Sequence, residues 1–495
     1  MRADFRWLAA GLATILLAGC TPDLPLPSEE PTPSPTPTAR DFTVSTSGPI
    51  RSADPAVALG DTDALIATNI YQRLMHVQTD TGELKPDAAT DCIFSAETIY
   101  ECTLPQTLTF HNGNALTSSD VRFSIQRALR LDVAGTAVSL LDSLVRISVP
   151  DPQTVRFHLA YADKRFGYAL TSVAASIVDE ESFDPDAALP LDALPIGSGP
   201  YRVDQIGEDA VVFSRYVDYA GPVAGVIDRI RLQHVADSVA AETAIAEATT
   251  DVVWRTLDPP ALDRLENEIK TNPDQTTAEG FTRWPLDGAR VTHLAWAVDS
   301  KHRSDADLRD GVARALQADR TLDSLVPAGV EAHIAAFRVG GRPILPEIKG
   351  ERITLRLRYD PSAPGHADTA SMLRARIEEL DRVSVRLVTE GAADLVLSDF
   401  PAWVPTAGGW LQGYLDEPLP GSADKLAELD HRSRTTSGDA RLVALGELQK
   451  QAAVDATVLP VSQTDGILFL GRGVSLAGLP LGSSGHLGLW GLRNA

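Results

Sequence analysis

The sequence predicts a mixed α/β fold of two or more lobes, preceded by two segments that do not belong to the folded body. The stretch from residue 41 to residue 495 is too long for a single hydrophobic core. Within it, residues 353–387 show a strand, a helix and a second strand, the pattern of a parallel βαβ unit. Residues 21–40 show no apolar periodicity and are not expected to form a core.

The first twenty residues have the pattern of a secretory signal. Arg2 and Arg6 precede an apolar run from Leu8 to Leu17, about half the length of a membrane-spanning helix. Two small residues then lead to Cys20, an ending that resembles the bacterial lipoprotein signal. In that family the peptidase cuts before the Cys, and the thiol carries a diacylglyceryl group. The resemblance implies that two acyl chains on Cys20 anchor the protein to the extracytoplasmic face of the cell membrane. The alternative is an ordinary signal peptide that ends near a Cys.

A Pro-rich spacer follows the leader. Residues 21–40 read TPDLPLPSEEPTPSPTPTAR. Such a chain stays extended at about 3.1 Å per residue and would hold a folded body on the order of 50 Å from the bilayer. We therefore expect a signal peptide at residues 1–19, and the lipidated Cys with its tether at residues 20–40.

The other two cysteines are expected to form a disulfide in a β-hairpin. If Cys20 is lipidated, Cys92 and Cys102 remain as an even pair in an oxidising compartment. Folding the segment between them about Glu97 makes them directly opposed in an antiparallel pair, close to disulfide range. The alternative is two free thiols. A metal site is not expected, because no CxxC motif or His–Cys cluster accompanies them.

Several secondary-structure elements follow from local patterns. Thr117 and Asp120 precede apolar positions in the manner of a capped helix start. Residues 353–359 and 383–387 alternate as half-buried strands, and residues 367–380 between them have helical spacing. Two more elements are expected, a strand at 394–397 and an amphipathic helix at 439–454.

Charge and motifs exclude several functions. The chain has 67 acidic and 44 basic residues and a formal charge of −23, which argues against nucleic acid as a partner. No catalytic constellation is present, and the Gly197-Ser198-Gly199 segment does not fit a G-x-S-x-G nucleophile elbow. We expect these two glycines to serve a sharp bend that needs an unusual φ. The sequence therefore predicts neither an enzyme nor a bound metal or cofactor.

One segment carries a specific family resemblance. Residues 109–129, TFHNGNALTSSDVRFSIQRAL, closely resemble the signature of family 5 extracellular solute-binding proteins, the peptide/nickel-type receptors of ABC importers. That signature runs F-H-D-G-x-P-L-T-A-x-D-V-x-F-S-x-x-R. Similar landmarks occur in the family's order at IYQRL (70–74), GELKPD (82–87), IGSGPY (196–201), DLRDGVARAL (307–316) and VLPV (458–461). The resemblance covers about residues 41–475.

The resemblance implies a two-lobe periplasmic-binding-protein-like fold of type II, the large peptide-binding class. Two α/β lobes would be joined by two crossing strands, near residues 285–292 and 458–466, with a hinge between the lobes. Lobe I would take residues 41–287, lobe II residues 288–461, and residues 462–495 would return to lobe I. A solute would be bound between the lobes by hinge closure. The closed form, expected to be a monomer without a cofactor, would then dock on ABC permease subunits.

Six residues are candidates for ligand binding. Trp254, Trp296, Trp403 and Trp410 fall where the family places ligand-facing segments, although tryptophan is also common in cores. Arg255 and Asp399 lie beside them and are candidates to hold a carboxylate and an amine, or else are solvated surface charges.

One departure from the family pattern bears on the ligand. Peptide-binding members carry an Asp after W-x-x that grips the peptide's α-amine, and by spacing from Asp394 that position is Trp403 here. The amine anchor is therefore missing, shifted to Asp399, or unneeded. A peptide is the expected ligand, and it would be held through its backbone or be N-blocked. The alternatives are an oligosaccharide, a metal chelate, or a surface lipoprotein without a transport role. The segment between Val326 and Arg352 also looks shorter than usual, which leaves the shape of lobe II open.

Overall fold

The structure is a computed structural model that describes residues 40–78, 81–400, 402–478 and 480–494. The expected signal peptide, Cys20 and nearly all of the tether lie outside the described residues. The body, Asp41–Ala495, is one compact unit. Among the helices of the described residues, none combines the length and apolar character that crossing a bilayer requires.

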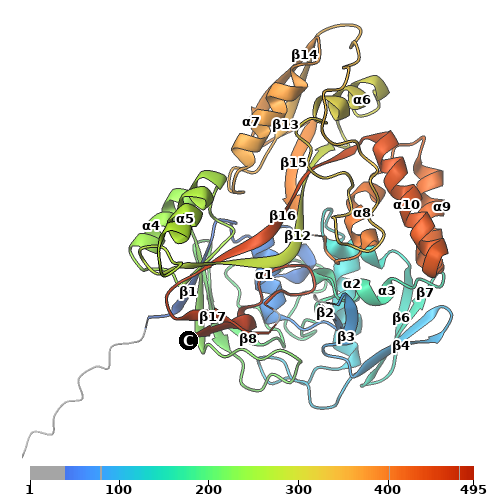
Figure 1. Cartoon of the computed structure of the whole chain (residues 1–495). Coiled ribbons are helices and arrows are strands. Elements are labelled where there is room, and N and C mark those ends of the chain that lie inside the picture. The colour runs from blue at the N-terminus through green and yellow to red at the C-terminus, as the bar shows by residue number, and fades with distance from the viewer. Residues whose placement is uncertain (1–39, 79–80, 401, 479, 495) are drawn as a thin grey trace, which may run out of the picture. The chain divides into compact units, whose positions relative to one another are not determined.

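A ten-stranded mixed sheet runs through the whole body, in the order β14-β13-β15-β12-β16-β11-β1-β10-β9-β8. Its two longest strands, β12 (Thr282–Trp296) and β16 (Val458–Leu470), pair antiparallel at the centre of this order. Figure 1 shows them side by side, crossing from the lower to the upper part of the molecule. We call residues 40–281 and 471–494 lobe I and residues 297–457 lobe II. The predicted boundaries after residues 287 and 461 fall inside these two strands and remain predictions.

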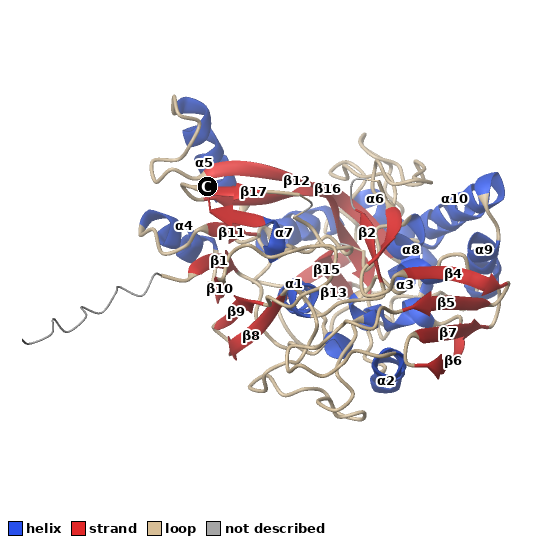
Figure 2. Cartoon of the chain, turned by 90° about the horizontal axis from the view of Figure 1, so that it is seen from below, coloured by secondary structure: helices blue, strands red, loops and turns tan. Residues whose placement is uncertain are grey.

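Lobe I contains one half of the large sheet and a separate four-stranded sheet in the order β4-β5-β7-β6. Figure 2 shows these four strands side by side. The strands of lobe I are β1 (Phe42–Thr46), β2 (Met75–Gln78), β3 (Glu83–Pro86), β4 (Asp91–Ala96), β5 (Ile99–Thr103), β6 (Leu144–Asp151), β7 (Thr154–Leu159), β8 (Tyr201–Ile206), β9 (Ala210–Arg215), β10 (Arg229–His234), β11 (Val252–Trp254), β17 (Val474–Leu476) and β18 (Leu492–Asn494). Its helices are α1 (Asp61–Ile70), α2 (Ser118–Leu131), α3 (Phe166–Ala169), α4 (Ser238–Ala246) and α5 (Pro259–Thr271), with 3-10 turns η1 (Pro55–Val57), η2 (Ala137–Leu141), η3 (Val173–Ala175) and η4 (Leu489–Gly491).

Lobe II contains the other end of the large sheet and, among its described residues, five helices. Its strands are β13 (Ile353–Arg358), β14 (Val383–Val388) and β15 (Leu395–Phe400). Its helices are α6 (Ala306–Ala315), α7 (His366–Ile377), α8 (Ala407–Leu415), α9 (Ala423–Thr435) and α10 (Gly438–Asp455). The predicted βαβ unit is confirmed, because β13 and β14 are parallel neighbours joined through α7. The helix expected at 439–454 is α10.

The start of α2 has the predicted capping chemistry. The Thr117 hydroxyl accepts a hydrogen bond from the N–H of Ser119, and the Asp120 carboxylate accepts one from the N–H of Thr117 at 2.8 Å. These reciprocal bonds satisfy N–H groups that have no partner inside the helix. The helix therefore begins at Ser118, directly after the predicted cap.

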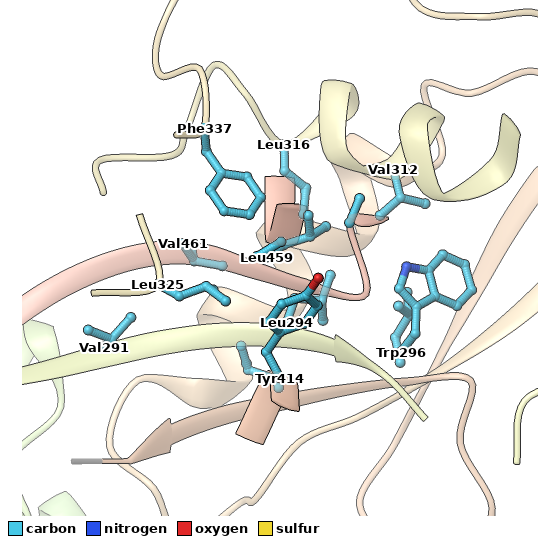
Figure 3. Close-up of a cluster of buried hydrophobic side chains, with 14 of the residues drawn as sticks. Val291, Leu294, Trp296, Val312, Leu316, Leu325, Phe337, Tyr414, Leu459 and Val461 are labelled. Carbon is cyan, nitrogen blue, oxygen red and sulfur yellow. The ribbon is translucent and has the colours of Figure 1, made fainter. Parts of the chain in front are cut away.

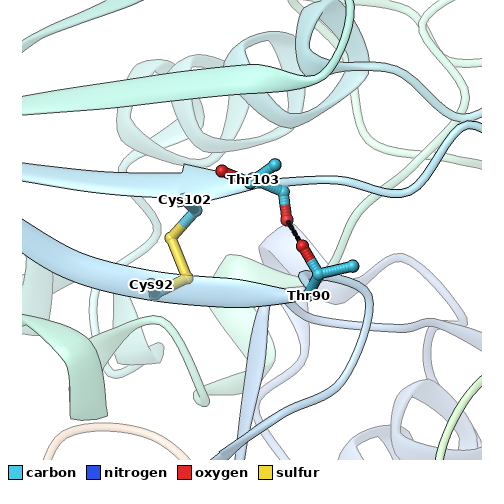
Figure 4. The surroundings of a disulfide bond; sticks show 4 residues. All are labelled: Thr90, Cys92, Cys102 and Thr103. Carbon is cyan, nitrogen blue, oxygen red and sulfur yellow. Dashed lines mark hydrogen bonds between the residues drawn. A yellow bond between two sulfur atoms is a disulfide. The ribbon is translucent and has the colours of Figure 1, made fainter.

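The predicted disulfide is present in the hairpin of β4 and β5. Cys92 and Cys102 are directly paired in the antiparallel register and are joined by an S–S bond. Figure 4 shows the bond between the two strands, with the Thr90 hydroxyl donating to the carbonyl of Thr103 nearby. This bond links the ends of a short loop, and the buried Cys102 joins it to the core of the small sheet.

Each lobe has its own hydrophobic core, and β12 and β16 enter the cores of both. Leu286 and Leu468 pack in a lobe I core, whereas Leu294 and Leu459 pack in the core of lobe II. Figure 3 shows the lobe II cluster around these two strands, including Trp296. The sheet is thus continuous through the junction while the apolar packing changes from one lobe to the other.

Candidate functional site

A cavity of about 240 Å³ lies between the lobes. Its lobe I side is formed by the end of β1, the start of α1 and the end of β11. Its lobe II side is formed by the loop before α7 and the end of β15. The lining residues are Thr46, Ser47, Gly48, Pro49, Arg51, Leu59, Gly60, Asp61, Thr62, Leu65, Trp254 and Arg255 from lobe I, and Asp360, Ser362, Ala363, Pro364, His366, Leu397, Ser398 and Asp399 from lobe II.

Four charged side chains form a closed ion network at the base of this cavity. Arg255 pairs with Asp61 and with Asp399, the latter at 3.0 Å. Arg290 pairs with the same two carboxylates, at 3.0 Å to Asp61 and 2.9 Å to Asp399. Each arginine thus bridges a carboxylate of lobe I and a carboxylate of lobe II. His486 lies beside the network, with its Nε2 atom 3.3 Å from Asp61, but burial lowers the pKa of His486 so that its ring is neutral.

The backbone places these four residues at the ends of elements. Arg255 follows β11 with a φ of 53°, in the left-handed region. Arg290 lies in β12 where its register with β16 shifts. Asp61 is the first residue of α1, and Asp399 is close to the end of β15. The network therefore joins the crossing strand β12 to both lobes.

Within the network, each charged side chain stabilises the charged form of its oppositely charged neighbours. Burial alone raises the pKa of Asp399, but Arg290 and Arg255 outweigh it and lower that pKa to about 2. Burial, and then the charge of Arg290, lower the pKa of Arg255 to about 9, with Asp399 opposing them. Both groups are therefore ionised at neutral pH.

A second cavity of about 200 Å³ lies on the other side of the same network. It is lined by Thr464–Ile467 of β16 and by apolar residues at the start of α5, among them Leu257 and Pro259. Arg255, Pro364 and Asp399 line both cavities.

The structure brings together three of the six candidate ligand-binding residues. Trp254, Arg255 and Asp399 all line the first cavity. Trp254 is 4% exposed, so only a small part of its ring is available there. Arg255 and Asp399 are paired with each other, so a ligand that uses either one must compete with that pair.

The structure places the other three tryptophans elsewhere. Trp296 is 1% exposed and Trp410 is 9% exposed, and both belong to the core of lobe II, which corrects the expectation that they line the cleft. A strand facing a helical layer and an amphipathic helix both bury their large apolar side chains, which explains this placement. Trp403 is half-buried and packs with Val404 against lobe I cores, so the loop after β15 is a contact between the lobes.

Sequence reasoning missed four residues of this region: Asp61, Arg290, His366 and His486. Arg290 gave a usable signal, because a charge in the middle of a long crossing strand needs a partner. A second signal is His366, a polar residue that directly follows Gly365 at the start of a helix. The Arg290 signal does not name its partners, Asp61 and Asp399, which come from segments more than one hundred residues away.

A second polar contact between the lobes surrounds Arg434 of α9. Its side chain is 1% exposed and pairs with Asp142 and Asp163 of lobe I and with Asp430 of its own helix. The backbone N–H of Lys164 donates to the carbonyl of Arg434 at 3.0 Å. The lobes are thus joined by polar contacts at the ion network and around Arg434, in addition to the apolar contact of the loop after β15.

The described part of the chain contains no metal site built from side chains alone. Within residues 40–494, apart from the few undescribed positions, no three His, Cys, Asp or Glu side chains are grouped in a way that could hold an ion.

Comparisons with known proteins agree with this architecture. The middle-region model of the bacterial extracellular solute-binding proteins, family 5, matches residues 83–339, more than half of the chain. The HTH-type transcriptional regulator SgrR of Pectobacterium atrosepticum is 30% identical over 185 residues, 37% of this chain and 31% of that protein. The probable D,D-dipeptide-binding periplasmic protein DdpA of Escherichia coli K12 is 26% identical over 274 residues, 53% of this chain and 50% of that protein. The chain thus spans about a third to a half of the length of these relatives.

Solved structures share the fold over nearly the whole chain. A dipeptide binding protein from Pseudoalteromonas sp. SM9913, in complex with Met-Leu, has a TM-score of 0.76 at 16% identity and covers 92% of this chain and 100% of its own. DppA from Helicobacter pylori, in complex with the peptide STSA, has a TM-score of 0.76 at 15% identity, with 91% and 97% covered. AgaA from A. tumefacien R10, in complex with agropinic acid, has a TM-score of 0.77 at 17% identity, with 92% and 98% covered. At these identities the likeness establishes the two-lobe α/β fold.

Proposed function

Because this chain belongs to the bacterial extracellular solute-binding proteins of family 5, we propose that it captures a peptide between its lobes and delivers it to the permease subunits of an ABC importer. Members of this family bind solutes and are not enzymes. The observation that supports capture is the cavity of about 240 Å³, whose walls come from both lobes. A solute in that cavity contacts both walls only when the lobes are closed, so binding favours the closed form.

Membrane anchoring belongs to the same proposal. Cys20 carries a diacylglyceryl group, and residues 21–40 act as the tether. A receptor held this way stays at a high effective concentration beside its permease.

A second candidate is a receptor for a small non-peptide solute. The cavity of about 240 Å³ is smaller than the roughly 300–1,000 Å³ of typical ligand sites. One structural neighbour, AgaA, was solved with agropinic acid, which is not a peptide.

Native mass spectrometry of the full protein as isolated from membranes tests the proposal. A bound peptide mass and a diacylglyceryl mass on Cys20 are the expected results. A peptide library should also raise the melting temperature, because a ligand that binds only the folded state stabilises it. A shift with sugars or chelates and with no peptide would favour the second candidate. No shift with any solute would favour a surface lipoprotein without a transport role.

A further inference from the structure

Two helices begin at the first cavity, one in each lobe. Gly60 to Thr62, at the start of α1, line it from lobe I, and Ala363, Pro364 and His366, at the start of α7, line it from lobe II. The first N–H groups of a helix have no partner inside the helix, and the helix dipole makes this end attractive to anions. In α7 the N–H of His366 donates to the carbonyl of Ala363 at 3.2 Å, so the N–H groups of the next residues are the ones a ligand would meet. Both N-cap positions are glycines, Gly60 and Gly365, which have no side chain with which to cap these groups.

His366 provides an independent sign of a missing ligand. The residue is 5% exposed and lines the cavity, and neither ring nitrogen has a hydrogen-bond partner. Buried polar groups in native proteins are nearly always satisfied, so an unpartnered imidazole here needs an explanation. A neutral imidazole donates from one nitrogen and accepts at the other. A ligand oxygen in the cavity would give this ring the partner that it lacks.

The charges around the cavity favour a ligand with a single negative charge. Asp61 and Asp399 are neutralised by Arg255 and Arg290, and Asp360 accepts hydrogen bonds from the N–H and hydroxyl of Ser362. Arg51 adds a further positive charge to the lining and Asp360 a negative one, so little net positive charge is left for a dianion. The two helix ends add partial positive charge on both sides, which Asp61 and Asp63 in the first turn of α1 and Asp368 in the first turn of α7 partly offset.

We propose that the cavity between the starts of α1 and α7 binds the carboxylate of a small solute, with His366 donating a hydrogen bond to it. This inference rests on the proposed solute-binding function and specifies its ligand. The carboxylate oxygens accept from the first N–H groups of the two helices, so the bound anion joins lobe I to lobe II. The cavity of about 240 Å³ limits the rest of the solute to a short chain such as a dipeptide.

Matched peptide libraries test the carboxylate directly. Di- and tripeptides with a free C-terminus are compared with the same sequences as C-terminal amides, by thermal shift and then by calorimetry on the full protein. The free acids should bind, and amidation should weaken binding at least tenfold. Equal binding of acids and amides would overturn the carboxylate site while leaving solute capture intact. If neither library binds, the inference is wrong, and native mass spectrometry still decides the proposed function.

Two variants test the residues without depending on a known natural ligand. His366→Leu removes an unpartnered polar group, so the unliganded melting temperature should stay the same or rise while affinity for the free acids falls at least tenfold. A structural role for His366 would instead lower the melting temperature without a loss of affinity. His302→Gln, in a loop of lobe II outside the cavity lining, is the matched control.

Gly60→Asp places a carboxylate where the ligand's carboxylate is expected. Gly60 has a φ of −104°, and a Cβ there would lie 3.4 Å from the nearest heavy atom, so a side chain is tolerated. The variant should leave the unliganded melting temperature close to that of the wild type, because the small gain from capping α1 is opposed by Asp61 and Asp63, and it should abolish binding of the free acids. Gly60→Ala should retain binding. Undiminished binding by Gly60→Asp would show that the anion does not sit at this helix end.

Discussion

His111 holds the bend at residues 197–199 with both nitrogens of its ring. Its Nε2 donates to the carbonyl of Gly199 at 3.0 Å, and its Nδ1 accepts from the N–H of Gly197 at 3.3 Å. Only the neutral imidazole makes both bonds. The two glycines are needed here because a Cβ on either would lie within 2.6 Å of backbone atoms of Ile70, which corrects the expectation of an unusual φ.

This arrangement predicts a pH-dependent contribution to stability. Burial lowers the pKa of His111 to about 4, whereas the unfolded side chain titrates near about 6.5. Between these values the unfolded state binds a proton that the folded state does not, so stability falls as the pH drops from about 6.5 to 4. His111→Gln should reduce the slope of unfolding free energy against pH in this window by up to about 1.4 kcal/mol per pH unit.

Urea unfolding at several pH values between 7 and 4.5 measures that slope. His302→Gln serves as the control and should leave it unchanged. The same slope in the His111 variant as in the wild type would contradict the prediction.

At the scale of the element, β12 carries two tryptophans with opposite roles. Trp296 is 1% exposed in the lobe II core, and Trp284 is 46% exposed near the other end of the strand. Trp296→Ala should lower the free energy of unfolding by about 3–5 kcal/mol, because it leaves a cavity in a packed core. Trp284→Ala should lower it clearly less, because nearly half of that side chain is already exposed to water.

Chemical denaturation measures both variants, and ligand affinity is measured beside it. Trp296→Ala should leave affinity unchanged wherever the protein remains folded. If the variant lost affinity while its free energy of unfolding stayed the same, Trp296 would have to contact the ligand in the cleft.

The sequence predicted elements better than it predicted the site, and particular residues show why. The cap at Thr117, the Cys92–Cys102 hairpin and the βαβ unit depend on neighbours within about forty residues, which local patterns record. The pairing of Arg255 with Asp61 and Asp399 depends on how distant segments meet. A tryptophan in a strand or helix looks the same in sequence whether it faces a cleft or a core, so Trp296 and Trp410 were misplaced.

At the scale of the whole molecule, Arg434 is expected to hold the lobes closed on the side away from the crossing strands. Burial alone lowers the pKa of Arg434, but Asp430, Asp142 and Asp163 outweigh it and raise that pKa above its usual value. Arg434→Gln leaves the buried Asp163 without its cationic partner and should destabilise the closed form by about 3 kcal/mol. Affinity for a captured solute should then fall up to about a hundredfold.

Small-angle X-ray scattering of the unliganded variant should show a larger radius of gyration than the wild type. Arg441→Gln, which removes an exposed pair with Glu331 inside lobe II, is the matched control. A wild-type radius and affinity in the Arg434 variant would exclude it as a closing contact.

The ion pair of Arg255 and Asp399 also forms part of the wall between the two cavities. Both side chains line the cavity at the helix starts and the cavity beside β16. A solute whose own charges replace this pair would therefore open the part of the wall beside Pro364 and connect the two spaces into one longer channel. The length of solute that the protein accommodates then depends on whether the solute carries the charges to open that wall, as well as on the size of either cavity.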